Sequence, residues 1–189
     1  MAWNTLFNQK MKRNLSLLIL ILFCLVVRQT NAQQTATIGK TISTVQLVDA
    51  SNHPKAIPFI GDKVMMIFYM DVDARNVNNP LTEALKEKKY TKDKVSGLGI
   101  INCKDTWIPE ALIRKGIQKS EKKSSESYVL LDTNHTLSKS WGLGGCNDRV
   151  VVIIIGKDSK IKFIKSLKSE DECKAIVATF LKTLDNELL

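Results

Sequence analysis

The 189-residue sequence lacks the features that mark several large classes of protein. Its longest mainly apolar run, Leu15–Val27, has 13 residues, whereas a helix that crosses a bilayer needs about 20. Residues 33–189 contain no internal repeat, no low-complexity tract and no Pro/Gly-rich linker. These absences argue against a solenoid, a disordered chain and two linked domains. Hydrophobic residues make up 44% and charged residues 25%, which is the balance of an ordinary folded domain.

Positive charge is modest once the first residues are set aside. The formal charge is +9, but residues 1–32 carry four basic residues and no acidic residue. The remaining 157 residues hold 24 basic and 19 acidic residues, which leaves a net charge of +5. We therefore expect no nucleic-acid partner, since such proteins usually carry a stronger basic excess.

Residues 1–32 have the pattern of a secretory signal peptide. Basic residues from Lys10 to Arg13 precede the apolar run, and the small residues Thr30 and Ala32 fit a cut after Ala32. An uncleaved N-terminal anchor is the alternative, which the shortness of the run disfavours.

The sequence leaves open whether Met1 or Met11 is the true start. A lipoprotein is disfavoured because Cys24 lies inside the apolar run and follows Phe23, where a small residue would be needed. We expect residues 33–189 to form one exported domain, periplasmic or secreted, with no stable membrane span after signal cleavage.

Cysteine is scarce in the predicted mature chain, which has only Cys103, Cys146 and Cys173. An odd number leaves at least one thiol unpaired, and no two of the three form a Cys-x-x-Cys motif. Cys173 falls on the apolar face of a predicted helix, so we interpret it as a core residue.

Hydrophobic periodicity predicts strands and helices in alternation. The predicted strands are 42–48, 63–70, 95–102, 128–131, 150–155 and 161–167. The predicted helices are 79–90, a helix capped at Thr106 that includes Ile117, 137–141 and 169–185. The run Lys63–Met70 has no polar alternation, which is typical of a strand covered on both faces. Ser169 and Glu172 form a capping box. The order predicts an α/β sandwich.

This order of elements resembles the thioredoxin fold. Val64–Met70 is similar to its central strand, 150–167 to its closing hairpin, and 169–185 to its final helix. Tyr128–Leu143 resembles the segment that redoxin-type members carry before the hairpin, namely an apolar strand, an Asp turn, a short helix and Trp-Gly. The resemblance implies a three-layer thioredoxin-like sandwich with a central mixed sheet and a C-terminal hairpin plus helix.

A narrower resemblance involves Gly99–Thr106, the Asp132 turn, Trp141 and Val150–Asp158. These segments are similar to the YtfJ-type family of exported thioredoxin-fold proteins. The likeness extends over nearly all of 38–187 and implies export as well as the fold.

The resemblance does not extend to a redox centre. A thioredoxin needs two cysteines where the central strand meets the next helix, and a peroxiredoxin needs Thr/Ser-x-x-Cys there. Tyr69–Asn78 contains no cysteine, and Cys146–Arg149 lacks the proline expected before the hairpin strand. The resemblance therefore implies no catalytic residue and no cofactor. The missing cysteines favour a protein that is not an enzyme.

Polar side chains nevertheless gather at the predicted edge where ligands of open α/β sheets bind. The residues at this edge are Asp71, Asp73, Arg75, Cys103, Asp105, Cys146, Asp148 and Arg149. In one interpretation, Cys103 and Cys146 form a structural or redox-active disulfide. The loops would have to bend to bring the two Cα atoms within about 6 Å.

Two other interpretations concern the carboxylates of this edge. Hard cations such as calcium prefer several oxygen ligands, and the candidate ligands are Asp71, Asp73, Asp105 and Asp148. No loop has a recognised ligand spacing, however. The interpretation that we favour is that the acids are solvated and pair with Arg75, Arg149 and Lys104, each pair contributing little.

The remaining candidates are two histidines and two tryptophans. His53 and His135 each fall in a predicted turn without a recognisable catalytic neighbour. Trp107 and Trp141 are interpreted as packing anchors.

The sequence thus favours an exported, non-enzymatic binding or envelope-associated domain. Its partner is unknown, with an envelope protein as the candidate. The rival hypothesis is a divergent thiol–disulfide oxidoreductase that uses Cys103 and Cys146.

Overall fold

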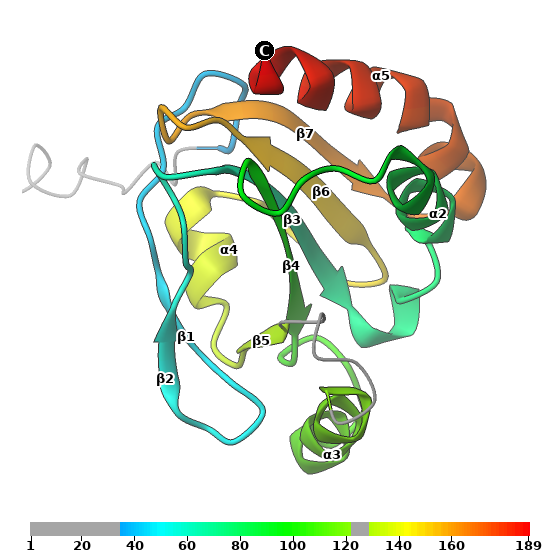
Figure 1. Cartoon of the computed structure of the whole chain (residues 1–189). Coiled ribbons are helices and arrows are strands. Elements are labelled where there is room, and N and C mark those ends of the chain that lie inside the picture. Colours follow the sequence, from blue (N-terminus) through cyan, green and yellow to red (C-terminus); the bar gives the residue numbers. More distant parts are fainter. Residues whose placement is uncertain (1–34, 122–128) are drawn as a thin grey trace, which may run out of the picture. The chain divides into compact units, whose positions relative to one another are not determined.

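The structure is a computed structural model that describes residues 35–121 and 129–189. The predicted signal peptide, residues 1–32, lies outside the described residues. Within these described residues, seven strands form one sheet in the order β2-β1-β5-β4-β3-β6-β7 (Figure 1). The strands are β1 (Gln46–Val48), β2 (Pro54–Ala56), β3 (Val64–Asp71), β4 (Val95–Asn102), β5 (Val129–Asp132), β6 (Val150–Ile155) and β7 (Ile161–Leu167). Because β3, β4 and β5 are parallel and the other pairings are antiparallel, the sheet is mixed.

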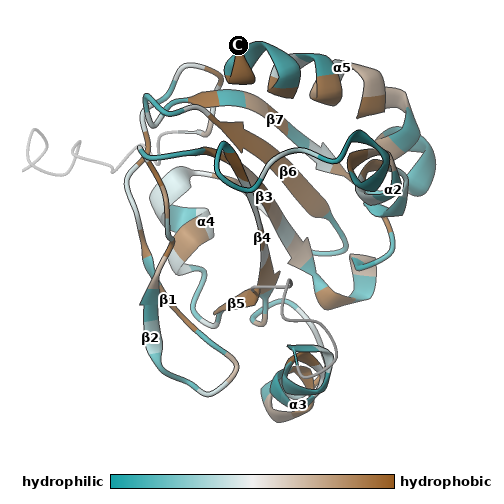
Figure 2. Cartoon of the chain, viewed as in Figure 1, coloured by the Kyte–Doolittle hydropathy of each residue, from teal (hydrophilic) through white to brown (hydrophobic). Residues whose placement is uncertain are grey.

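The inner strands β3 and β6 are the most apolar part of the sheet. All six residues of β6 are buried, and β3 lies between β6 and β4. Figure 2 shows hydrophobic colour along both strands. A strand covered on both faces needs no polar alternation, so the central place predicted for residues 63–70 is confirmed.

Helices cover both faces of the sheet (Figure 1). On one face lie α2 (Asn79–Lys88) and α5 (Glu170–Leu188), whose residues share one core cluster. On the other face, α4 (Thr136–Trp141) contributes Leu137 and Trp141 to a second cluster. A third cluster joins α3 (Glu110–Glu121) to β5. The three layers and the final hairpin plus helix confirm the predicted α/β sandwich.

Local capping explains where α5 begins. The Glu172 amide donates to Ser169 Oγ at 3.3 Å, and the Glu172 carboxylate accepts from the Lys168 amide at 2.7 Å. Both partners predicted for the capping box therefore engage backbone N–H groups. None of the helices within 35–121 and 129–189 is long and apolar enough to cross a membrane.

The start of α3 differs from the prediction. The helix begins at Glu110 and not directly after Thr106. Thr106 Oγ1 accepts from the Ile108 amide at 3.2 Å and donates to the Asp73 carboxylate at 3.3 Å. Thr106 thus shapes the loop before the helix and links it to the short 3-10 helix η1 (Val72–Ala74), which follows β3.

Candidate functional site

Three buried polar residues lie side by side where the parallel strands end. Asp71 of β3 pairs in register with Asn102 of β4, and Asn102 pairs with Asp132 of β5. Their exposed fractions are 0%, 0% and 1%. Burying a polar group costs free energy unless the group is hydrogen-bonded. The hydrogen-bond partners of these three residues therefore show which parts of the edge they hold in place.

Asp71 joins two loops that are far apart in the sequence. Its Oδ1 accepts from the Asp73 amide at 3.2 Å, and its Oδ2 accepts from the Asp148 amide at 2.8 Å. The Asp71 amide in turn donates to the Arg149 carbonyl at 3.0 Å. The loop after β3 and the loop before β6 are therefore held by one buried carboxylate.

Asn102 organises the loop after β4. Its Oδ1 accepts from the Lys104 amide at 3.0 Å, and its Nδ2 donates to Asp105 Oδ2 at 2.6 Å. The other carboxylate oxygen of Asp105 lies 2.9 Å from His135 Nε2, just before α4. His135 thus has an acidic partner that lies 30 residues away in the sequence.

Asp132 holds the start of α4. Its oxygens accept from the amides of Thr136 and Leu137 at 2.7 and 3.0 Å. The Tyr69 hydroxyl donates to Asp132 Oδ2 at 3.1 Å. Burial, followed by the charge of Asp132, raises the pKa of Tyr69 well above its usual range, so the phenol stays protonated and remains a donor.

The four aspartates predicted as cation ligands do not all lie together. Asp71, Asp73 and Asp148 have oxygens within 4.8 Å of one another, whereas Asp105 belongs to the Asn102 and His135 contacts. Three clustered carboxylates are the donor type that hard cations prefer. Asp71, however, already directs both oxygens at backbone amides.

The pairing expected with the basic residues of the edge does not form. Among the described residues, no ion pair joins these acids to Arg75, Arg149 or Lys104. Every buried side-chain nitrogen or oxygen in the described part of the chain has a hydrogen-bond partner. The acids of the edge are thus engaged mainly by amides, hydroxyls and His135.

Cys103, Cys146 and Cys173 are free thiols in the structure. Cys103 packs against the hydrophobic cluster that joins α3 to β5 (the α3 cluster). Cys146 belongs to the cluster that contains Leu137 and Trp141 of α4 (the α4 cluster). Burial raises the pKa of Cys103 to about 12, helped by the charge of Glu110. Burial also raises the pKa of Cys146 to about 11, helped by Asp105. Since the thiolate is the nucleophile in thiol exchange, neither site favours that reaction.

The two tryptophans have opposite environments. Trp141 is buried in the α4 cluster, and its Nε1 donates to the Ser43 carbonyl at 3.0 Å, as expected of a packing anchor. Trp107 is 83% exposed on the loop between β4 and α3, so its interpretation as a packing anchor was wrong. It follows Thr106, whose contact with Asp73 fixes this loop near the β3 end.

Residues 61–183 match a family described as bacterial protein of unknown function (YtfJ_HI0045). The chain belongs to this family. No curated protein sequence matches it at a significant level.

Solved structures show which fold this member of the YtfJ family has. It is similar to a peroxiredoxin-like protein from Aquifex aeolicus, with a TM-score of 0.53 and 14% identity over 79% of this chain and 88% of that chain. It is also similar to a thiol peroxidase from Chromobacterium violaceum, with a TM-score of 0.54 and 13% identity over 79% and 88% of the two chains. These likenesses show a thioredoxin-like fold.

The sequence pattern predicted Asp71 at this edge of the YtfJ-family protein but did not predict Asn102 or Asp132 there. Asn102 was assigned only to a strand end and Asp132 only to a turn. A usable signal was available, since Asp71, Asn102 and Asp132 each end an apolar run. Strands that end together at a carboxyl edge bring their last residues into one row.

Proposed function

We propose that this protein is an exported thioredoxin-fold domain that acts by binding a partner at the carboxyl edge of its sheet, without thiol–disulfide exchange. The observation that carries the proposal is the environment of Asp71. A thioredoxin needs its reactive cysteine where the central strand meets the next helix. Here that place is occupied by a buried aspartate whose two oxygens accept from the amides of Asp73 and Asp148.

The thiols support the same proposal. Their raised pKa values keep Cys103 and Cys146 protonated at neutral pH, and the two residues belong to different apolar clusters. A thiol that stays protonated attacks a disulfide slowly. The exposed Trp107 at this edge offers instead the large aromatic contact that is enriched in protein interfaces.

The direct test compares the protein with a variant in which Cys103, Cys146 and Cys173 are all serine. Reduction of insulin disulfides, and consumption of hydrogen peroxide with a thiol donor, should proceed at the same background rate for both proteins. Turnover that disappears in the triple variant would support the oxidoreductase hypothesis instead. Mass spectrometry of protein from its native compartment should find Gln33 at the N-terminus and all three thiols free.

The binding role needs a separate experiment. A photo-reactive residue at Trp107 should capture one discrete partner in the native compartment. The same residue at Lys182, which is exposed on α5, serves as the matched control. Equal crosslinking from both positions would contradict a specific binding edge.

A further inference from the structure

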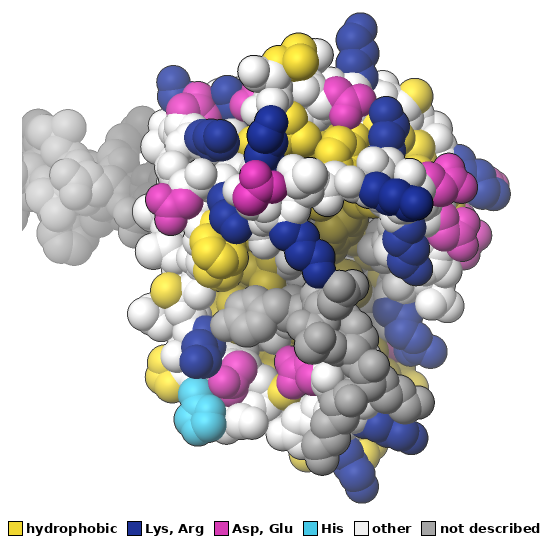
Figure 3. Space-filling view, viewed as in Figure 1, with side chains coloured by type: hydrophobic (Ala, Val, Ile, Leu, Met, Phe, Trp, Pro, Cys, Tyr) yellow, Lys and Arg dark blue, Asp and Glu magenta, His cyan; other side chains and the backbone are white. Residues whose placement is uncertain are grey.

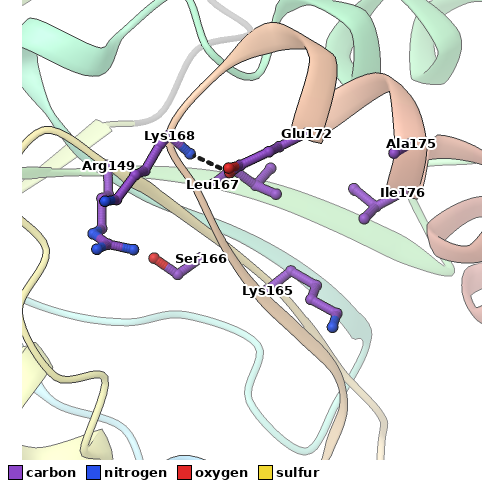
Figure 4. Close-up of a pocket in the computed structure, with 8 residues that line it drawn as sticks. All are labelled: Arg149, Lys165, Ser166, Leu167, Lys168, Glu172, Ala175 and Ile176. Atoms are coloured by element: carbon purple, nitrogen blue, oxygen red, sulfur yellow. Dashed lines mark hydrogen bonds between the residues drawn. The ribbon is translucent and has the colours of Figure 1, made fainter.

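A groove lies between the end of β7 and the first turns of α5 (Figure 4). Its volume of about 470 Å³ falls in the range of sites for small ligands. Leu167, Ala175 and Ile176 form its apolar part. Its polar part is formed by Arg149, Lys165, Ser166, Lys168 and Glu172.

The strand register places two of the cations opposite each other. Val150 of β6 is paired with Leu167 of β7, so the next residues outward, Arg149 and Lys168, face one another beyond the ladder. In Figure 4 both side chains lie on the same side of β7, the Ser166 hydroxyl faces the Arg149 guanidinium, and Lys165 extends the other way. Like charges in directly opposite positions are destabilising, so this arrangement favours a bound anion.

In the described part of the chain, no acidic side chain forms an ion pair with either of these two cations. Arg149, Lys165 and Lys168 form no ion pair there, and the Glu172 carboxylate is engaged by the Lys168 amide at 2.7 Å. Elsewhere basic and acidic groups do pair: Lys162 lies 3.0 Å from Asp158. Figure 3 shows basic and acidic side chains interspersed around α2 and α5. Other basic residues of the described chain, such as Lys104 and Lys182, also form no ion pair, so the groove is distinguished by the facing positions of Arg149 and Lys168.

We propose that Arg149, Lys168 and Ser166 bind a phosphate group, either free inorganic phosphate or the monoester headgroup of a lipid. The guanidinium supplies two parallel N–H donors, a geometry that matches phosphate oxygens. Lys168 adds a second positive charge and Ser166 a hydroxyl donor. The site shares Arg149 with the carboxyl edge but uses neither the cysteines nor Trp107, so its test can fail independently of the function proposed above.

The first experiment titrates the purified full-length chain with inorganic phosphate, at an ionic strength held constant with chloride, and follows backbone amides by NMR. The amides of Ser166 and Lys168 should shift saturably. Arg149→Gln and Lys168→Gln should each weaken binding by about tenfold, the loss expected when a charge-assisted hydrogen bond is removed. Lys165→Gln is the matched control and should stay within about twofold.

Thermal unfolding gives an independent measurement. Phosphate should raise the midpoint temperature of the parent protein, because a ligand that binds only the folded state stabilises it. Lys168→Gln should unfold at a slightly higher temperature than the parent without phosphate, since the like-charge pair is gone, and should gain less when phosphate is added.

A vesicle experiment separates the two sources of the phosphate group. Co-sedimentation with vesicles of phosphatidylcholine containing phosphatidic acid, weakened by Arg149→Gln but not by Lys165→Gln, would support the lipid headgroup. Saturable binding of inorganic phosphate without co-sedimentation would support free phosphate. The proposal is overturned if inorganic phosphate gives no saturable shift and phosphatidic acid vesicles do not co-sediment with the protein, or if Lys165→Gln weakens binding as much as Arg149→Gln.

Discussion

Asp71 and Asp132 are the same residue type in the same row of the sheet, yet they stabilise different kinds of structure. Asp132 accepts from amides four and five residues ahead and so fixes the start of α4. Asp71 accepts from the Asp148 amide, 77 residues away in the sequence, and so joins two loops. One carboxylate organises a local turn, and the other organises the tertiary arrangement around it.

The difference shows how buried carboxylates can hold together the carboxyl edge of a thioredoxin-like sheet. A buried carboxylate that accepts backbone N–H groups forms strong, charge-assisted hydrogen bonds. Removing such a residue leaves buried donors unsatisfied, which costs more than the bonds themselves contributed. The two aspartates should therefore differ in what fails when each is removed.

The largest effect is expected for Asp132→Ala. The substitution leaves the amides of Thr136 and Leu137 and the Tyr69 hydroxyl without their acceptor. We expect the free energy of unfolding to fall by about 3 kcal/mol, measured by urea denaturation. Asn134→Ala, at an exposed neighbouring position, is the control and should change it by less than about 0.5 kcal/mol. Equal losses in the two variants would show that the carboxylate is not what holds α4.

Asp71→Ala should cost about 2 kcal/mol, because two amides lose their acceptor. Asp71→Ala should differ from Asp132→Ala in which amides lose their protection from hydrogen exchange. Hydrogen exchange should accelerate at the Asp73 and Asp148 amides together, although they lie far apart in the sequence, while the Thr136 amide stays protected. Asp73→Ala keeps both bonds to Asp71 and is the matched acidic control. If only the Asp73 amide became faster, the two loops would not be joined through Asp71.

Tyr69→Phe sharpens the comparison through a double-mutant cycle. The Tyr69 hydroxyl donates to Asp132 and shares no partner with Asp71. Its removal should cost about 1 kcal/mol in the parent protein. Most of that cost should disappear in the Asp132→Ala background and persist in the Asp71→Ala background. Additive losses in both backgrounds would contradict a specific Tyr69–Asp132 bond.

The contrast between the aspartates also explains what the sequence could predict. The turn at Asp132, the capping box at Ser169 and the apolar strand before Asp71 depend on neighbours within a few residues, and all three were predicted. The prediction that Thr106 caps α3 was wrong. Its hydroxyl donates to Asp73, 33 residues away, and a contact over that distance leaves no local pattern in the sequence. The hydrogen bond that the Asp148 amide donates to Asp71 could not be predicted from the sequence for the same reason.

The wrong interpretation of Trp107 has a different cause. A tryptophan usually buries most of its surface, and that average favoured a packing anchor. The residue lies on a loop at the edge of the sheet, however, and is 83% exposed. Whether a layer covers a loop depends on the arrangement of helices in space, which residue type alone does not determine.

The smallest expected effect concerns the pKa values of Cys103 and Cys146, to which Asp132 contributes and Asp71 does not. The negative charge of Asp132 contributes to the raised pKa of both Cys103 and Cys146, because it disfavours the thiolate. Removing that charge in Asp132→Asn should lower both pKa values from about 12 and about 11. Reaction with iodoacetamide, followed for each cysteine by mass spectrometry at pH 8 to 10, should then be faster at every pH.

Asp71→Asn is the matched control for this charge effect and should leave both reaction rates unchanged. Cys173 reports any general opening of the protein, since its pKa is raised by burial and then by Glu170, with no contribution from Asp132. A faster reaction at all three cysteines would indicate loss of structure in place of a change in thiol pKa. Acceleration at Cys103 and Cys146 alone, in Asp132→Asn alone, would show that the two buried carboxylates differ in their electrostatic reach as well as in the structure each one holds.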